Sequence, residues 1–263
     1  MGINKSIRVA FIAVCTLIVS FGSLSTVADA ATKYYLPTKT TKYEYNTKNK
    51  SWKKVGTSSI KYNKKGYAVK MKCREYGTPY THTIKYKYYS NKKLKQKIIK
   101  NGYLGETIKY KYNKKGKLIS LYGEKVSVNK RGFLKKTLSY SGKHKIKYKY
   151  YKGFPKKITA GKDYSVLNKK GLVTKAKFQM YGETSIVTFK YKYGKGGRVK
   201  SVVITDRTGN ETYKYKIVYS YSKAKRTKSK KKWSVMIGSD MQTSLGPYYQ
   251  AVQAFSPYDC AIE

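Results

Sequence analysis

Lysines that alternate with tyrosines are the side chains with the clearest chemistry in this sequence. An ammonium group is a compact point charge without the planar fork of a guanidinium group, so it suits diffuse phosphate or carboxylate density better than one specific ligand. The chain holds 59 Lys and Arg against 12 Asp and Glu, a formal net charge of +47. These features predict a polyanion-binding surface. Its candidate residues are Lys85, Lys87, Lys109, Lys111, Lys147, Lys149, Lys190, Lys192, Lys214 and Lys216.

Groups suited to catalysis or metal binding are few and scattered. The only histidines are His82 and His144, and Cys73 with His82 supplies one pair where a zinc site needs three or four ligands. No Gly-x-Ser-x-Gly motif or other nucleophile context appears. The recurrent glutamates follow Gly or Asn, as in Gly182-Glu183, which favours a turn position over a pair of converging carboxylates. We therefore expect a non-enzymatic protein with no metal and no cofactor; a hydrolase ranks last among the rival functions.

The candidate lysines lie in a repeated unit in which apolar and charged residues alternate. Residues 83–88 read Thr-Ile-Lys-Tyr-Lys-Tyr, and close copies occur at 107–112, 145–150 and 188–193. A period of two places Ile and Tyr on one face and Lys on the other, which is typical of a half-buried antiparallel strand and excludes an amphipathic helix. The tyrosine face is expected to form the core, and the lysine face to meet solvent.

Turn sequences separate these strands. Asn-Lys-Lys-Gly occurs at 63–66 and 113–116, and both Asn and Gly tolerate the positive φ that a tight reversal needs. The sequence thus predicts an all-β fold: an extended, twisted antiparallel sheet of serial β-hairpin repeats of about 20 residues each. An open ribbon, a coil and a closed barrel remain alternatives for its overall form.

The repeats resemble the YD-repeat (Rhs-type) family, whose unit has the form Tyr-x-Tyr-Asp-x-x-Gly-Arg-Leu. Residues 110–118 read Tyr-Lys-Tyr-Asn-Lys-Lys-Gly-Lys-Leu, with Asn in place of Asp, and residues 191–199 match with Gly in that place. The resemblance extends over residues 40–222. It implies an extracellular β-hairpin scaffold built as a long, strongly twisted antiparallel sheet.

Three segments are expected along the chain. Residues 1–30 read as a cleavable signal peptide, because Lys5 and Arg8 precede an apolar run that ends at Ala28-Asp29-Ala30; an uncleaved anchor is the alternative. Residues 31–232 form the Tyr- and Lys-rich hairpin repeat domain. Residues 233–263 contain no Lys or Arg and read as a low-charge C-terminal cap, or as a disordered tail.

Cys73 and Cys260 are the cysteines that remain after export. In an oxidising compartment they can form one disulfide that ties the C-terminal segment to an early hairpin. The alternative is a pair of unpaired thiols.

Export and positive charge together predict a secreted or cell-wall-associated bacterial protein. Its expected partner is an anionic cell-wall polymer, an acidic polysaccharide or extracellular nucleic acid, with an anionic membrane surface as a peripheral alternative. Rival functions are an adhesin that binds glycans through tyrosine clusters and a cationic toxin or antimicrobial effector. The plainest alternative is that lysine only keeps a tyrosine-rich sheet soluble and blunts its edges.

Overall fold

The computed structural model describes residues 35 to 223, except 64–67, 78–80, 92, 102–103, 132, 137–144, 152–153, 170–171 and 181. The expected signal peptide and the C-terminal segment lie outside the described residues. The described chain forms one 15-stranded antiparallel sheet and a short 3-10 turn, η1 (Lys195–Gly197). No helix in this part of the chain is long and apolar enough to cross a membrane. The strands are β1 (Tyr35–Asn46), β2 (Ser51–Tyr62), β3 (Ala68–Glu75), β4 (Thr81–Tyr88), β5 (Leu94–Asn101), β6 (Leu104–Tyr112), β7 (Leu118–Leu121), β8 (Glu124–Lys125), β9 (Ile146–Tyr151), β10 (Phe154–Ala160), β11 (Asp163–Leu167), β12 (Val173–Met180), β13 (Glu183–Tyr193), β14 (Val199–Thr208) and β15 (Glu211–Lys223).

The strand order confirms the prediction of an all-β sheet made of serial hairpins. Consecutive strands are neighbours except β8 and β9, and β1 pairs with β15 at the centre, giving the order β8-β7-β6-β5-β4-β3-β2-β1-β15-β14-β13-β12-β11-β10-β9. The sheet is not closed, because β8 and β9 form its two edges. Isolated bridges lie in the chain between these edges and join Val128 to Leu134 and Lys136 to Lys145.

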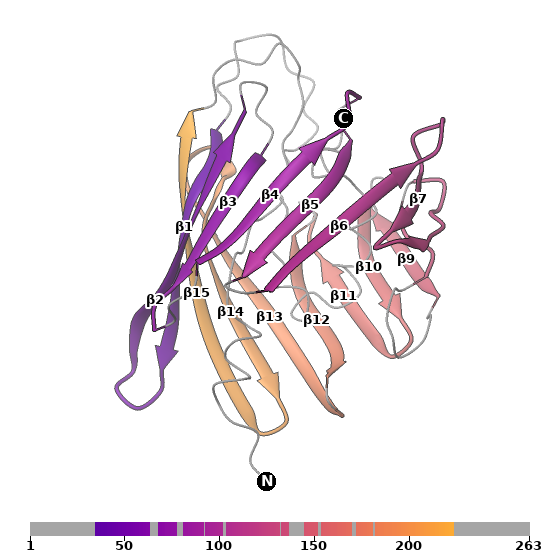
Figure 1. Cartoon of the computed structure of the whole chain (residues 1–263). Coiled ribbons are helices and arrows are strands. Elements are labelled where there is room, and N and C mark those ends of the chain that lie inside the picture. The colour runs from indigo at the N-terminus through magenta and orange to yellow at the C-terminus, as the bar shows by residue number, and fades with distance from the viewer. Residues whose placement is uncertain are drawn as a thin grey trace.

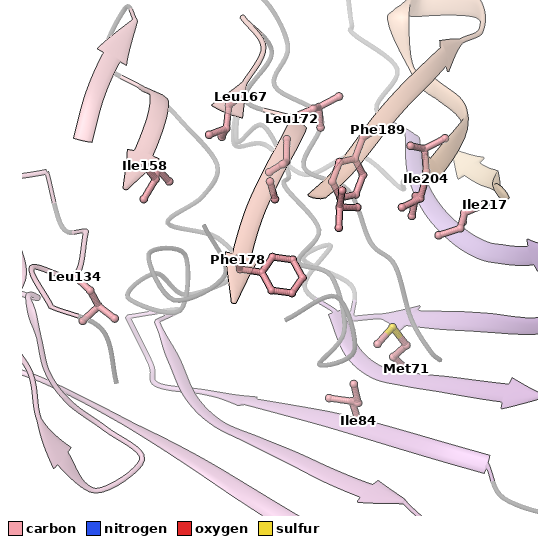
Figure 2. Packing of buried hydrophobic residues seen from close by; sticks show 14 of the residues in the cluster. Met71, Ile84, Leu134, Ile158, Leu167, Leu172, Phe178, Phe189, Ile204 and Ile217 are labelled. Carbon is pink, nitrogen blue, oxygen red and sulfur yellow. The ribbon is translucent and has the colours of Figure 1, made fainter. Parts of the chain in front are cut away.

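The sheet curls so that one face lies inside. In Figure 1, strands β4 to β6 form a wall in front of β10 to β13, and β1, β2, β14 and β15 form the bend between them. Figure 2 shows Met71 and Ile84 on one side of the interior, with Phe189, Ile204 and Ile217 on the other. Met71 is fully buried and Ile84 is 2% exposed. Burying each such side chain contributes roughly 1.5–3 kcal/mol, so this inner face holds the fold together.

Burial along each repeat strand follows the predicted alternation. On β4, Ile84 and Tyr86 are buried, whereas Lys85 and Lys87 are exposed. The same two-residue period continues on β13, where Val187 is buried on the inner side. Aliphatic side chains make up most of the buried interior, and tyrosines join them: Tyr86, Tyr110, Tyr215 and Tyr219 are buried, and further tyrosines pack against this core while partly buried.

The lysine-rich turns are held by asparagine side chains. Asn113 Oδ1 accepts a hydrogen bond from Lys117 N at 2.9 Å, and Gly116 takes a φ of +73°, a conformation that favours glycine. Similar bonds run from Lys93 N to Asn91 Oδ1, from Arg131 N to Asn129 Oδ1 and from Leu172 N to Asn168 Oδ1. The side-chain oxygen thus replaces a backbone partner in each turn.

The last inward tyrosine of several strands caps a carbonyl on the neighbouring strand. The hydroxyls donate from Tyr88 to Ala68 O (2.6 Å), from Tyr191 to Val173 O (2.7 Å) and from Tyr221 to Val199 O (2.9 Å). Each accepting residue begins its strand, beside a register shift next to the turn. A bulge disrupts the hydrogen-bond ladder locally, and the hydroxyl donates to a carbonyl beside that disruption. This role requires tyrosine rather than phenylalanine.

Candidate polyanion-binding site

The predicted lysines all lie on the outer face of the sheet. The residues next to them along each strand point to the other face and are buried, for example Ile84, Ile108 and Ile217. Lys216 is half-buried. The other predicted lysines are exposed: Lys85, Lys87, Lys109, Lys111, Lys147, Lys149, Lys190, Lys192 and Lys214.

The sheet does not bring these lysines into one patch. Strand β5 separates β4 from β6, β14 separates β13 from β15, and β9 lies at an edge. The residues opposite the predicted lysines are mostly neutral: Lys85 faces Ile98 on β5, and Lys190 faces Val203 on β14. Like-charge repulsion therefore does not arise between these pairs, because the repeat strands alternate with strands of another composition. Lys149 is an exception, since it faces Lys157 on β10.

A row of like charges occurs instead across β2, β3 and β4. Lys61 lies opposite Lys70, and Lys70 lies opposite Lys85. Partial burial and the positive charges of Lys72, Lys85 and Lys61 lower the pKa of Lys70. Sequence reasoning missed Lys61 and Lys70, although both lie in alternating segments that a search for strand periodicity finds. We call Lys61, Lys70 and Lys85 the lysine row.

Carboxylates are absent from the outer face of the described residues. In an antiparallel pair, opposite residues share a face. Glu44 lies opposite Tyr215 and Asp206 opposite Val187, and both of these partners are buried inside the curl. The other acidic residues that the structure describes also pair with inner-side positions near the turns at one end of the strands: Glu75, Glu106, Glu124, Asp163, Glu183 and Glu211.

The inner acidic residues have local structural contacts. Glu75 Oε1 lies 3.8 Å from Lys42 Nζ, and Asp163 Oδ1 accepts a hydrogen bond from Gln179 N at 3.2 Å. Burial raises the pKa of Asp206. Within the described ranges, no group of three or more His, Cys, Asp or Glu residues is placed to hold a metal ion. These carboxylates thus act in the turns and inner rim of the sheet.

The division between an inner ring face and an outer amine face has exceptions. Lys97 is 6% exposed and lies opposite the buried Tyr86, so this amine is inside the curl. Tyr43 and Trp52 lie on the outer side, where Lys216 Nζ is 4.9 Å and 4.6 Å from their ring centroids. The alternation that predicts most of the sheet fails at these positions.

Cys73 faces the interior. It is 1% exposed, lies opposite Ser58 and His82, and is disulfide-bonded. Burial lowers the pKa of His82. The described residues contain no other cysteine, so its partner lies outside them, and the predicted pairing with Cys260 stays a prediction.

Comparisons with known proteins give no family for this chain. No protein-family model matches it, and no curated protein is similar enough to count as a relative. Among solved structures it is similar to a porin-like protein from Bacteroides uniformis, with a TM-score of 0.38 and 12% sequence identity, over 71% of this chain and 98% of that chain. The resemblance to YD-repeat proteins therefore stays a prediction.

Proposed function

We propose that this is an exported, non-enzymatic protein of the cell surface or wall that binds anionic polymers through the outer face of its curled sheet. The observation that carries the proposal is the absence of carboxylates from the described outer face, while lysines occupy it on β2, β3, β4, β6, β9, β13 and β15. A polymer of phosphate or carboxylate groups laid on this face meets attraction without a competing negative charge.

The lysine row argues against a role in solubility alone. Mixed charges of both signs keep a surface soluble. Three ammonium groups in register repel one another, and like charges directly opposite are destabilising in a sheet. A bound polyanion removes this repulsion, so the arrangement favours binding over simple solvation.

A salt series tests the proposal. Binding to long-chain polyphosphate and to sheared double-stranded DNA should weaken at least about 100-fold between ~50 and ~500 mM NaCl, because bound lysines release counterions and the screening length shortens about threefold. The Lys61→Gln/Lys70→Gln/Lys85→Gln variant should bind more weakly and show a shallower salt slope. Affinity that does not change with salt would rule out the proposal.

A charge-matched control distinguishes the effect of the outer-face lysines on affinity from the effect of total charge. Lys48, Lys50 and Lys162 lie in turns at the end of the strands that holds the acidic residues. Replacing these three by Gln removes the same charge and should leave affinity close to that of the unmodified protein. An equal loss in both triple variants would mean that net charge, not the outer face, drives binding.

A further inference from the structure

Aromatic side chains gather on the outer face of β1 and β2, beside β15, which pairs with β1. Tyr43 and Tyr45 of β1 and Trp52 of β2 are half-buried there, and Trp52 is the only tryptophan of the described residues. Tyr43 lies opposite Lys216 and Lys54, and Tyr45 lies opposite Trp52. Most other rings of the repeats point inward, so this group breaks the rule that builds the rest of the sheet. We call Tyr43, Tyr45 and Trp52 the aromatic platform.

Cations surround the platform at close range. The Tyr45 and Trp52 rings meet edge to face, with centroids 5.1 Å apart. Lys216 Nζ lies 4.9 Å from the Tyr43 centroid and 4.6 Å from the Trp52 centroid, and Lys214 Nζ lies 5.4 Å from the Tyr45 centroid. Ring surface and ammonium groups are thus presented together on one solvent-facing strip.

The platform extends toward the β3–β4 turn. Tyr76 is 43% exposed, and Lys54 Nζ lies 5.3 Å from its ring centroid. The pKa of the Tyr76 hydroxyl is lowered, chiefly by its hydrogen bond with Lys54; desolvation opposes this effect, and the Lys54 charge, a hydrogen bond with Thr57 and the Arg74 charge add to it. An exposed tyrosine held under a lysine continues the same pairing of ring and cation.

We propose that the aromatic platform binds the sugar rings of an acidic polysaccharide. A sugar ring offers an apolar C–H face to an aromatic ring, its hydroxyl groups need hydrogen-bond partners, and its carboxylate or phosphate groups need cations. Within the described part of the chain, the Tyr43 and Tyr45 hydroxyls have no hydrogen-bond partner of their own, so they are available to sugar hydroxyls. Stacking of nucleobases depends on the ring faces alone, whereas a sugar can use both the ring faces and the hydroxyls.

The platform and the lysine row share strand β2. Trp52 and Lys61 are nine residues apart on β2 and both face outward, a separation of about 30 Å at the usual rise of a strand. One polysaccharide chain can therefore contact both. The inference rests on the proposed function, and it narrows the polymer to one that contains sugar rings.

The test compares polymers with and without rings. The probes are polygalacturonate, polyphosphate, which has no rings, and single-stranded DNA, all at ~150 mM NaCl, which partly screens bulk attraction and keeps polyphosphate binding measurable. Trp52→Ala should weaken polygalacturonate binding at least about tenfold, the order of one lost stacking contact, and leave polyphosphate binding unchanged. The control is Tyr151→Ala, which removes an aromatic residue that is 38% exposed on the edge strand β9.

A fluorescence readout avoids any change within the platform. The chain has two tryptophans, so Trp233→Phe leaves Trp52 as the only tryptophan emitter. Polygalacturonate should then change Trp52 emission, and polyphosphate should not. No change in emission, or an equal loss of affinity for both polymers in Trp52→Ala, overturns the inference. A loss of affinity in Trp52→Ala that is confined to single-stranded DNA would show that the platform binds nucleobases instead of sugar rings. Failure of every polymer to bind at low salt would instead refute the proposed function.

Discussion

Lys70 on β3 and Lys85 on β4 lie directly opposite each other on the outer face of the sheet. Nothing in the packing of the core requires two amines at these positions, because the inward residues of the same strands, Met71 and Ile84, make the buried contacts. The pair adds repulsion to the folded protein. A polyanion that binds across β3 and β4 relieves that repulsion, so the unbound protein is less stable than its core would allow.

Removing one member of the pair should therefore raise the stability of the unbound protein and weaken polyanion binding. Lys70→Gln should raise the melting temperature by about 1–3 °C at low salt, because the like-charge contacts with Lys61 and Lys85 disappear. The same change should weaken polyanion binding. Scanning calorimetry measures the expected rise in melting temperature, and a binding titration measures the expected loss of affinity.

Lys72→Gln is the matched control. Lys72 lies on the same strand and face but opposite the neutral residues Ser59 and Thr83. Its removal should raise the melting temperature less than Lys70→Gln does. Equal shifts for the two variants would show that the register contacts with Lys61 and Lys85 add nothing beyond general charge.

The capping tyrosines should each contribute measurable stability. Tyr191→Phe keeps the ring but removes the donor to Val173 O at 2.7 Å, so the unfolding free energy should fall by about 1–2 kcal/mol. Denaturant unfolding measures the change. Tyr43→Phe, on the outer face, should change the unfolding free energy by less than about 0.5 kcal/mol. A Tyr191→Phe variant as stable as the unmodified protein would contradict the capping role.

We expect the protein to unfold in alkali, because its buried tyrosines lose their stabilising contribution when they ionise. Burial raises the pKa of Tyr221 to about 12 despite the nearby Arg198 charge, and burial raises the pKa values of Tyr62, Tyr148 and Tyr191 further. An unfolded tyrosine has a pKa of about 10, so the unfolded chain binds fewer protons above that pH. The stability that these residues contribute is complete below pH ~10 and is lost as pH rises through their folded pKa values.

Tyrosinate absorbance and circular dichroism, recorded together against pH, check this expectation. Part of the tyrosine titration should occur in one step with the loss of β structure. Independent titration of all tyrosines near their ordinary pKa, with the sheet intact, would be inconsistent with a tyrosine core.

Identifying the disulfide partner of Cys73 tests whether the C-terminal segment is tied to the sheet. We expect Cys260 as the partner, since Cys15 lies in the expected signal peptide. Cys260→Ser should lower the unfolding free energy by up to about 4–5 kcal/mol, as for a long closed loop. Peptide mapping without reductant identifies the pair, and a freely alkylated Cys260 in the unmodified protein would contradict the pairing.

The strands can be predicted from the sequence because the same two-residue alternation recurs in each repeat. Alternation of Ile and Tyr with Lys on β4 predicts which side chains are buried, and the Asn-Lys-Lys-Gly turn at Asn113 predicts where the chain reverses. Each is a local property of neighbouring residues. Strand type, turn position and the outward direction of the lysines could therefore be predicted.

Which lysines meet could not be predicted, because that depends on the pairing of separate strands. The repeats identify Lys85 but not its partner Lys70, which lies in a strand of different composition. Pairing of β1 with β15 likewise joins residues far apart in the chain, and it brings Lys216 against Tyr43 and Trp52. The aromatic platform itself lies on the β1–β2 hairpin, but the lysines of β15 reach it only through that long-range contact.

The most direct test of the polyanion-binding face is lysine footprinting. The protein is acetylated with and without bound polyanion, and peptide mass spectrometry reports the protection of each amine. Lys61, Lys70, Lys85 and Lys87 should become protected, while Lys48, Lys50 and Lys162 stay reactive. Uniform protection of all lysines, or protection of the turn lysines alone, would contradict the account.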